Sequence, residues 1–232
     1  AVSSVKNQGS CGSCYAFSAI ASYESALCFN GYAKCSQDDD DGEAINLSEQ
    51  QVLDCGSYLP DKNTDRMWKE FGGCGGGWQS NVYQYIYMAG GISDGKTFYP
   101  YESGNAAAYP DNPYNVGTCP YNWSSRNDWM IKNRLSWVSK DICGTTSKNS
   151  NTDPEYLKQA IYEKGPISIN MYVNGTFSAY DGTGVYEPAE YDCPNLLLTG
   201  INHCMLAVGY GRENGVDYWI VKNSWGPEWA DQ

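Results

Sequence analysis

The positions of apolar residues predict one long helix near the start of the chain. From about Cys14 to Cys28 the side chains on one face are apolar at helical spacing, and only Glu24 interrupts them with a charge. The Gly12-Ser13 step before this segment is a turn at which such a helix can begin. We therefore expect Cys14 at the N-terminal end of a helix.

Three more helices are indicated by their start and stop signals. One covers residues 47–53, where Ser48 and Gln51 have the spacing of a capping box. Another covers Ser80 to Ala89 and stops at the glycine pair that follows. The last runs from Pro154 to Lys164, with an aspartate before it as N-cap and a glycine after it as the stop.

The last third of the chain changes to strand-like patterns. Ile167 to Val173, Cys204 to Tyr210 and Asp217 to Lys222 have the composition of strands and are separated by turns that contain glycine. The stretch from about Tyr99 to Ser150 is rich in Gly, Pro, Asn, Ser and Tyr, which predicts loops. Helices first and strands later favour an α+β fold with two unlike halves.

Composition narrows the class of protein. The chain has 232 residues, enough for one large domain or two small ones, and 41% hydrophobic with 18% charged residues fits an ordered globular protein. The net charge of −12 argues against a nucleic-acid partner, because binding phosphates requires a basic surface. No apolar run approaches the ~20 residues of a membrane span. The first residues lack the apolar region of a signal peptide.

The ten cysteines indicate the compartment. Spread along the whole chain, they suggest disulfides in a secreted or vesicular protein rather than metal ligands. Cys28 and Cys35 are close enough in sequence to pair with each other. Three glycosylation sequons, at Asn46, Asn122 and Asn174, agree with a secretory route.

The pair Cys11 and Cys14 allows three interpretations: a redox dithiol, half of a zinc site, or one structural and one catalytic cysteine. Zinc needs a second close pair of ligands, but there is no other C-x-x-C and His203 is the sole histidine. A redox motif of the thioredoxin type follows a β-strand, which this beginning lacks. A helix that starts at the second cysteine fits the third interpretation, because a helix N-terminus and a nearby imidazolium stabilise the nucleophilic thiolate.

His203 is the candidate acid–base partner of that thiolate. A lone histidine is usually structural, but this one lies just before an apolar run, at the start of a predicted strand that can aim it. Downstream, Asn223 offers an amide oxygen that can orient an imidazole, and Trp225 can shield that contact from water.

Six sequence segments occur in one order along nearly the whole chain. They are residues 8–18 (QGSCGSCYAFS), 47–55 (LSEQQVLDC), 73–77 (GCGGG), 99–101 (YPY), 202–203 (NH) and 223–226 (NSWG). Together they resemble the motifs of the papain-like cysteine proteases, the papain and cathepsin family. The resemblance implies a two-domain α+β fold. A helical domain would cover about residues 1–133 and a β-barrel-like domain about 134–232, with the active site in the cleft between them.

The resemblance also implies roles for individual residues. Cys14 is the nucleophile and His203 its acid–base partner. Asn223 orients the imidazole and Trp225 covers that contact. Gln8 donates its side-chain amide to the oxyanion, together with the backbone N–H of Cys14.

The substrate cleft follows from the same resemblance. Its lining is expected to be Gly76, Gly77, Trp78, Gln79, Asn170, Ile201 and Cys204. The glycines permit close approach of an extended peptide backbone. The other residues fall at the pocket for the substrate side chain two positions before the cut. Because Asn170 is polar, a simple preference for large apolar side chains is not expected.

Disulfide partners are implied as well. The resemblance pairs Cys11 with Cys74 and Cys55 with Cys119, whereas the usual partner of Cys193 would lie beyond residue 232. Without Cys14, nine cysteines remain, so at least one more has no partner within the chain. Cys204 is a candidate buried thiol, and Cys143 has no assignment.

The implied function is a cysteine endopeptidase that acts on proteins or peptides in a lysosome or vacuole or after secretion. We expect a monomer without cofactor or metal, controlled by an inhibitory propeptide and by cystatin-like inhibitors. A single histidine excludes a histidine-bearing occluding loop, which disfavours an exopeptidase. The alternative is a catalytically silent binding protein, although silent relatives usually lose the cysteine or the histidine.

Three features depart from the family pattern. Tyr15 stands where tryptophan is usual, and the separation of Cys14 from His203 exceeds the typical ~130–150 residues. The surplus lies mainly in the acidic segment 37–41 and in residues 101–150, which we expect to be surface insertions. Both ends are expected to be clipped, because the family has further residues before residue 1 and another strand after Trp229.

Overall fold

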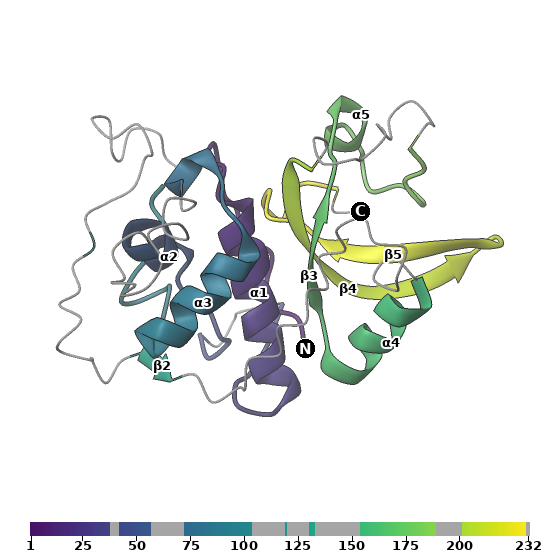
Figure 1. The fold of residues 1–232 in the computed structure, drawn as a ribbon. Helices are drawn as coiled ribbons and strands as arrows, with labels where there is room; N and C mark the ends of the chain where they lie inside the picture. Colours follow the sequence, from purple (N-terminus) through teal and green to yellow (C-terminus); the bar gives the residue numbers. More distant parts are fainter. Residues whose placement is uncertain are drawn as a thin grey trace.

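The computed structural model describes residues 1–37, 42–56, 72–103, 119, 130–132, 154–188 and 201–230. Helices α2 (Glu49–Cys55) and α3 (Gln79–Ala89) lie on one side of helix α1 (Cys14–Phe29) (Figure 1). The antiparallel strands β3 (Ile167–Met171), β4 (His203–Glu213) and β5 (Val216–Lys222) lie on its other side, together with two further helices. This is the expected α+β arrangement of two unlike halves. Within the described ranges, none of the helices combines the length and the apolar character that crossing a membrane requires.

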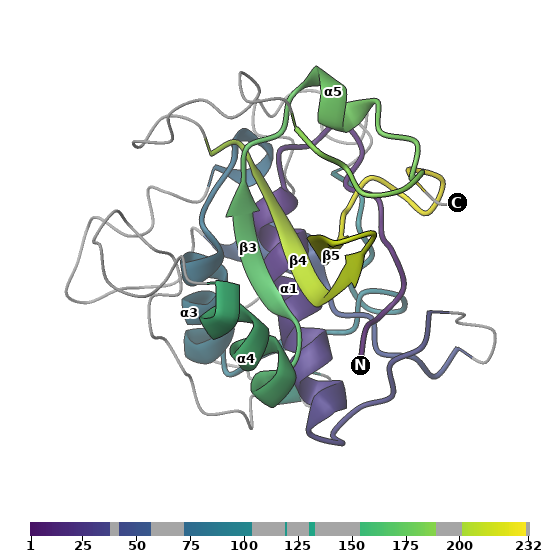
Figure 2. The same ribbon diagram turned by 90° about the vertical axis from the view of Figure 1, so that its right-hand side faces the viewer.

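Helix α1 begins at Cys14, as predicted, and ends one residue later than expected, at Phe29. It is buried on nearly every side, because α2 and α3 pack on one flank and strands β3 and β4 on the other. The same arrangement is visible from the side, where the sheet crosses in front of α1 (Figure 2). The central helix therefore fixes the position of Cys14 relative to both halves.

Helix α2 (Glu49–Cys55) has the predicted N-cap but only half of the predicted capping box. The Ser48 hydroxyl accepts the Gln51 backbone N–H at 3.0 Å. The Gln51 side chain does not return to Ser48. Its oxygen accepts the backbone N–H of Ser93 at 2.7 Å and its nitrogen donates to Tyr85. The buried backbone N–H of Ser93 is bonded by the Gln51 side-chain oxygen, so this tertiary hydrogen bond takes the place of the expected contact with Ser48.

The segment predicted as loops contains one short strand. Helix α3 (Gln79–Ala89) ends at Gly90, whose φ of 80° stops it as expected. Strand β1 (Gly91–Ser93) follows and pairs antiparallel with β2 (Met130–Lys132). The loop prediction was therefore wrong at β2, since a strand of three residues is too short to show an alternating pattern. The expected domain boundary at residues 133–134 lies outside the described residues, as do most of residues 101–150, the acidic segment 38–41 and the N-cap expected at Asp153.

The second half contains the three predicted strands in an antiparallel sheet of order β3-β4-β5. Its elements are α4 (Pro154–Lys164), β3 (Ile167–Met171), α5 (Gly175–Ser178), β4 (His203–Glu213) and β5 (Val216–Lys222). The turn from β4 to β5 is Asn214-Gly215, with φ of 50° and 89°. Positive φ at both positions is the mark of a tight hairpin turn, and asparagine followed by glycine is its preferred sequence.

A buried cluster of charges ties the N-terminal segment to the helices. Both oxygens of Glu24, which is fully buried, are used: one accepts from Lys6 Nζ at 2.8 Å and from the Leu47 backbone N–H at 2.7 Å, and the other from the Ser3 hydroxyl at 2.5 Å. Lys6 also bonds Glu49 at 2.7 Å. Burial alone would lower the pKa of Lys6, but the two carboxylates raise it above its ordinary value.

The structure joins the three expected cysteine pairs, which are Cys11–Cys74, Cys28–Cys35 and Cys55–Cys119. Cys14 and Cys204 carry thiols, as expected for the nucleophile and for a buried cysteine. Cys143 and Cys193 lie outside the described residues.

Candidate active site

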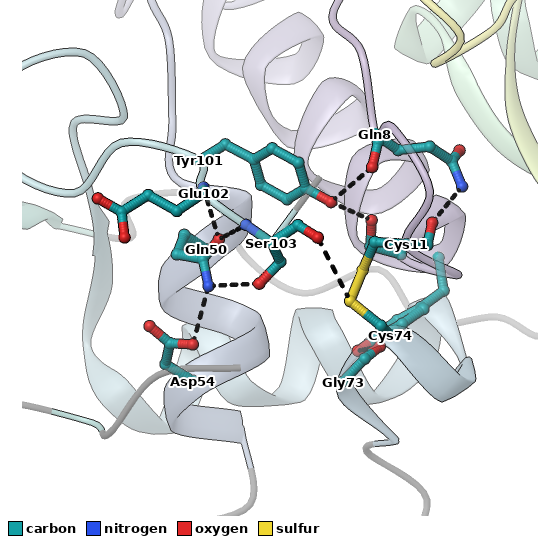
Figure 3. Close-up of a disulfide and its surroundings, with 11 residues drawn as sticks. Gln8, Cys11, Gln50, Asp54, Gly73, Cys74, Tyr101, Glu102 and Ser103 are labelled. Atoms are coloured by element: carbon teal, nitrogen blue, oxygen red, sulfur yellow. Dashed lines mark hydrogen bonds between the residues drawn. A yellow bond between two sulfur atoms is a disulfide. The ribbon is translucent and has the colours of Figure 1, made fainter. Parts of the chain in front are cut away.

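The Cys11–Cys74 disulfide fixes the turn that leads into α1 (Figure 3). The Gly12 N–H donates to the Cys74 carbonyl at 2.9 Å, and a Cβ at Gly12 would lie only 2.5 Å from that oxygen. The turn therefore requires glycine. The side-chain amide of Gln8 donates to the Cys11 carbonyl at 2.7 Å, and the Tyr101 hydroxyl donates to the Gln8 carbonyl at 2.9 Å. These contacts hold the start of α1 in one place.

The same disulfide decides between the interpretations of the C-x-x-C motif. Cys11 is bonded to Cys74, so it cannot form a redox pair or a metal site with Cys14. In the parts of the chain that the structure covers, no group of three or more His, Cys, Asp or Glu side chains could hold a metal ion. The arrangement fits one structural and one reactive cysteine.

Cys14 is the first residue of α1 and is half-buried. A hydrogen bond from the Cys204 thiol favours its thiolate, burial opposes ionisation, and contacts with His203 and with the Cys204 backbone N–H favour it again. Together they lower the pKa of Cys14 to about 5. At neutral pH the side chain is therefore a thiolate, which is the nucleophilic form.

His203 has its tautomer fixed by Asn223. The Asn223 Oδ1 accepts the backbone N–H of Ser224 at 2.8 Å, and it also lies 2.8 Å from Nε2 of His203. An oxygen that already accepts from a backbone N–H is an acceptor, so the imidazole must donate through Nε2. This leaves Nδ1 for Cys14.

Trp225 covers this contact. Its ring lies 4.8 Å from the His203 ring between centroids, at 33° between planes, and both His203 and Asn223 are buried. The Nδ2 of Asn223 is buried without a partner among the described residues. The Trp225 ring therefore lies over the imidazole whose Nε2 bonds Asn223.

Gln8 is held from both ends. Its Oε1 accepts the Ser224 hydroxyl at 2.6 Å, and its backbone N–H donates to the Ser224 carbonyl at 2.8 Å. One of the two N–H bonds of its amide points to Cys11, and these contacts leave the second unused. Ser224 lies in the NSWG segment, but nothing in the sequence indicated that it positions Gln8.

The two expected cleft glycines differ in their surroundings. Gly76 has a φ of 108°, and a Cβ there would have open space around it as far as the described residues show. At Gly77 a Cβ would lie 2.7 Å from the Tyr15 ring, so glycine is needed there for packing. Trp78 and Ile201 are both about half exposed, at 48% and 51%, and can contact a ligand.

The remaining pocket residues form a polar cluster. Gln79 donates its amide to Asn170 Oδ1 at 2.6 Å and to the Ile169 carbonyl at 3.3 Å. The Cys204 sulfur lies 3.2 Å from the same Asn170 oxygen, directly across strands β3 and β4. The structure therefore brings Gln79, Asn170 and Cys204 together. The sequence did not reveal this cluster, because its three members come from segments that lie far apart along the chain.

Comparison with known sequences places this site in a family. A family profile described as "Papain family cysteine protease" matches residues 1–232. Mouse (Mus musculus) cathepsin S is 34% identical over 232 residues, which is 100% of this chain and 54% of that protein. Pro-cathepsin H of Medicago truncatula is 36% identical over 231 residues, 99% of this chain and 52% of that protein. The chain spans about half the length of the curated relatives it matches.

Solved structures agree. Digestive procathepsin L2 from the larval midgut of Tenebrio molitor has a TM-score of 0.64 and 32% identity, with 98% of this chain and 56% of that chain covered. The bromelain protease of Ananas comosus, in complex with the E64 inhibitor, has a TM-score of 0.63 and 30% identity, with 100% and 81% covered. The motifs, the fold and these likenesses agree, and the chain belongs to the papain family of cysteine proteases.

Proposed function

We propose that the protein is a cysteine endopeptidase that cleaves peptide bonds with Cys14 as nucleophile and His203 as acid–base partner. The observation that supports this proposal most strongly is that Cys14 interacts with His203, which in turn bonds Asn223. The His203–Asn223 bond of 2.8 Å is buried beneath Trp225. The Cys14 proton passes to Nδ1 of His203, the thiolate attacks the peptide carbonyl, and His203 gives that proton to the leaving amine. A water molecule, deprotonated by His203, then hydrolyses the thioester.

The oxyanion of the tetrahedral intermediate would be bound by two donors. One is the backbone N–H of Cys14 at the start of α1, where the helix dipole also favours negative charge. The other is the second N–H of the Gln8 amide. Both donors are fixed before substrate arrives, because the disulfide turn and Ser224 hold them.

Substrates are proposed to be proteins or peptides that bind in extended form along Gly76 and Gly77. This cleft is proposed to lie between two domains whose boundary is near residues 133–134. The pocket proposed for the substrate side chain two positions before the cut contains the amides of Gln79 and Asn170 and the sulfur of Cys204, which contact one another. Such a pocket offers hydrogen bonds as well as apolar contact, so we propose that it accepts polar as well as apolar side chains.

Control and location are proposed from the relatives. Two solved neighbours are described as procathepsins, which supports an inhibitory propeptide for this protein. Cystatin-like inhibitors and a monomeric state are further proposals. The three disulfides fit an oxidising compartment, so we propose a lysosomal, vacuolar or secreted protein.

Labelling with an epoxide-type thiol reagent, followed by peptide mapping, tests the proposal. We expect one modified residue, Cys14, and loss of peptidase activity in step with labelling. Label at another residue, or no label in folded protein, would contradict the nucleophile assignment. Labelling at Cys14 without any peptide hydrolysis would favour the alternative of a silent binding protein.

Replacing Gln8 with alanine should lower kcat/KM by about 10²–10³-fold, because one oxyanion donor is lost. The matched control is Ser224→Ala, which keeps the Gln8 amide but removes the hydroxyl that holds it at 2.6 Å. Its loss should be much smaller. Steady-state kinetics on one peptide substrate measure both, and a Gln8→Ala variant with wild-type kcat/KM would contradict the assignment.

The acid limb of kcat/KM against pH should have its midpoint near pH 5, the pKa of Cys14. Below it the thiolate is protonated and activity falls. The Cys204→Ala variant loses a hydrogen bond to the thiolate, so its midpoint should move to higher pH, whereas Cys204→Ser keeps a donor and should move less. The pH dependence of alkylation at Cys14 gives the same midpoints independently. An unchanged midpoint in the alanine variant would contradict this account.

A further inference from the structure

One hydroxyl group connects the two proposed oxyanion donors. The Tyr101 hydroxyl points at Gln8 and donates to its backbone carbonyl at 2.9 Å (Figure 3). The Ser13 hydroxyl lies 2.7 Å from the same Tyr101 oxygen. Gln8 carries one donor on its side chain, and the peptide bond between Ser13 and Cys14 carries the other. Tyr101 therefore contacts the chain on both sides of the proposed oxyanion hole.

The direction of these two hydrogen bonds is fixed. A carbonyl only accepts, so the single Tyr101 proton goes to Gln8, and the Tyr101 oxygen accepts the proton of the Ser13 hydroxyl. Burial raises the pKa of Tyr101 to about 12, so Tyr101 keeps its proton at neutral pH. Ser13 is fully buried, at 0% exposure, so its hydroxyl cannot exchange this partner for bulk water.

Ser13 is the N-cap residue of α1, but its side chain does not cap the helix. A serine at this position normally has an extended backbone and accepts an N–H of the first turn. Ser48 does this at the start of α2, with a ψ of 111° and a bond from the Gln51 N–H at 3.0 Å. Ser13 instead has a φ of −92° and a ψ of 13° and makes no side-chain cap bond. Its hydroxyl is bonded to Tyr101 in place of the helix.

The ψ angle of Ser13 joins α1 to the turn that carries Gln8. The Cys14 N–H moves with α1, because the Ser13 carbonyl of the same peptide bond accepts the N–H groups of Ala16 and Phe17 at 2.8 and 3.2 Å. Gln8 lies on the other side of this angle. Rotation of Ser13 toward a capping conformation would therefore move Gln8 relative to the Cys14 N–H, and the two donors would no longer converge on one oxygen.

We propose that Tyr101 is a positioning residue of the oxyanion hole: by accepting the Ser13 hydroxyl it prevents Ser13 from capping α1, and it so keeps Gln8 and the Cys14 N–H at the spacing that binds one oxyanion. The inference rests on the proposed function in taking these two groups as the oxyanion donors. The Cys11–Cys74 disulfide holds the turn itself, whereas the Tyr101 hydroxyl acts where the turn meets α1.

Steady-state kinetics of Tyr101→Phe on one peptide substrate test the proposal. Phenylalanine keeps the ring that lies edge-on to Phe17 at 4.8 Å but lacks the hydroxyl. Because the oxyanion exists only in the transition state and the intermediate, we expect kcat to fall about 10- to 100-fold and KM to change by less than about threefold. The matched control is Tyr99→Phe, which removes a hydroxyl of the same segment that bonds Asp54 at 2.7 Å. Its kcat should stay near that of the wild type.

A double variant, Tyr101→Phe with Ser13→Ala, separates this role from a general loss of packing. Alanine cannot cap α1, so the second change should raise kcat at least about threefold above that of Tyr101→Phe alone. A merely structural role of the two hydroxyls predicts a further loss instead. The rate at which iodoacetamide alkylates Cys14 should not change in any of these variants, because alkylation forms no oxyanion.

Three kinetic results would overturn the inference: a wild-type kcat in Tyr101→Phe, an equal loss in Tyr99→Phe, or a double variant no more active than Tyr101→Phe. A crystal structure of Tyr101→Phe supplies a readout without substrate. In it the Ser13 hydroxyl should accept an N–H of the first turn of α1, and an unchanged Ser13 would contradict the inference.

Failure of the inference and failure of the proposed function are distinguishable. An active wild type whose Tyr101→Phe variant keeps its kcat refutes the inference and leaves the peptidase standing. A wild type that cleaves no peptide refutes the peptidase, and the crystal structure of Tyr101→Phe then decides whether Tyr101 keeps Ser13 from capping α1.

Discussion

Replacing Cys14 with serine should lower kcat/KM for peptide hydrolysis by at least about 10⁴-fold, with little change in folding. The thiolate at the start of α1 exists because its pKa is lowered to about 5, and a serine hydroxyl at the same position stays protonated. His203 would then face an un-ionised hydroxyl, which cannot attack the peptide carbonyl as the thiolate does. Residual turnover would come only from the oxyanion donors and from substrate binding.

A matched control changes the neighbouring cysteine in the same way. Cys204→Ser makes the same replacement of one sulfur by one oxygen in the same site. We expect its kcat/KM to be at least about a hundredfold higher than that of Cys14→Ser. His203→Ala should resemble Cys14→Ser, and the double variant should be no worse than either one. Residues that act as a unit are not additive, so additive losses would show that they act separately.

The identity of the reacting groups was predictable because their signals are local. A glycine-serine turn before an apolar helical pattern placed Cys14 at a helix start, and α1 begins there. Asn223 and Trp225 indicated how His203 would be oriented, and a buried hydrogen bond of 2.8 Å joins His203 to Asn223. The first feature depends on neighbours within a few residues, and the second joins two strands of one hairpin, β4 and β5, so both arise within short stretches of the sequence.

What the sequence could not supply are contacts between distant segments. Cys204 was expected to line a pocket, but its contact with Asn170, which also accepts from Gln79, depends on how β3 pairs with β4 and on how α3 packs near them. Likewise, the capping box at Ser48 was only half right, because Gln51 found a better-placed partner in Ser93. A local sequence pattern therefore indicates which partners a side chain could bond, but the packing of distant segments determines which partner it does bond.

Glu24 is the sharpest case. It interrupted the apolar face of the predicted helix, and a charge there is usually a reason to doubt the prediction. The helix forms nevertheless, because Lys6 and the Leu47 backbone N–H compensate the buried carboxylate at 2.8 and 2.7 Å. Neither partner is close in sequence, so only the fold shows why a fully buried glutamate is tolerated.

Replacing Glu24 with glutamine should therefore destabilise the protein by about 3–5 kcal/mol, which corresponds to a fall in Tm of roughly 10 °C. Glutamine fits the same space but removes the negative charge beside Lys6. It also replaces an accepting oxygen with an N–H group that faces donors, since both carboxylate oxygens of Glu24 accept hydrogen bonds. Calorimetry or circular dichroism melts at constant pH measure the change.

Glu155→Gln is the control for this prediction. Glu155 bonds Lys158 at the same 2.8 Å, but its side chain is 77% exposed, so water replaces the lost partner and no measurable change in Tm is expected. Equal shifts in the two variants would mean that burial does not set the cost at Glu24.

A double-mutant cycle with Lys6→Met completes the test. Each single change leaves an opposite charge buried with too few partners, whereas the double change removes both charges of the 2.8 Å pair together. The double variant should then lose at least about 1 kcal/mol less stability than the sum of the two single losses. Full additivity would mean that Lys6 and Glu24 stabilise the protein independently. In that case the buried glutamate in α1 would owe its place to the Leu47 and Ser3 hydrogen bonds alone.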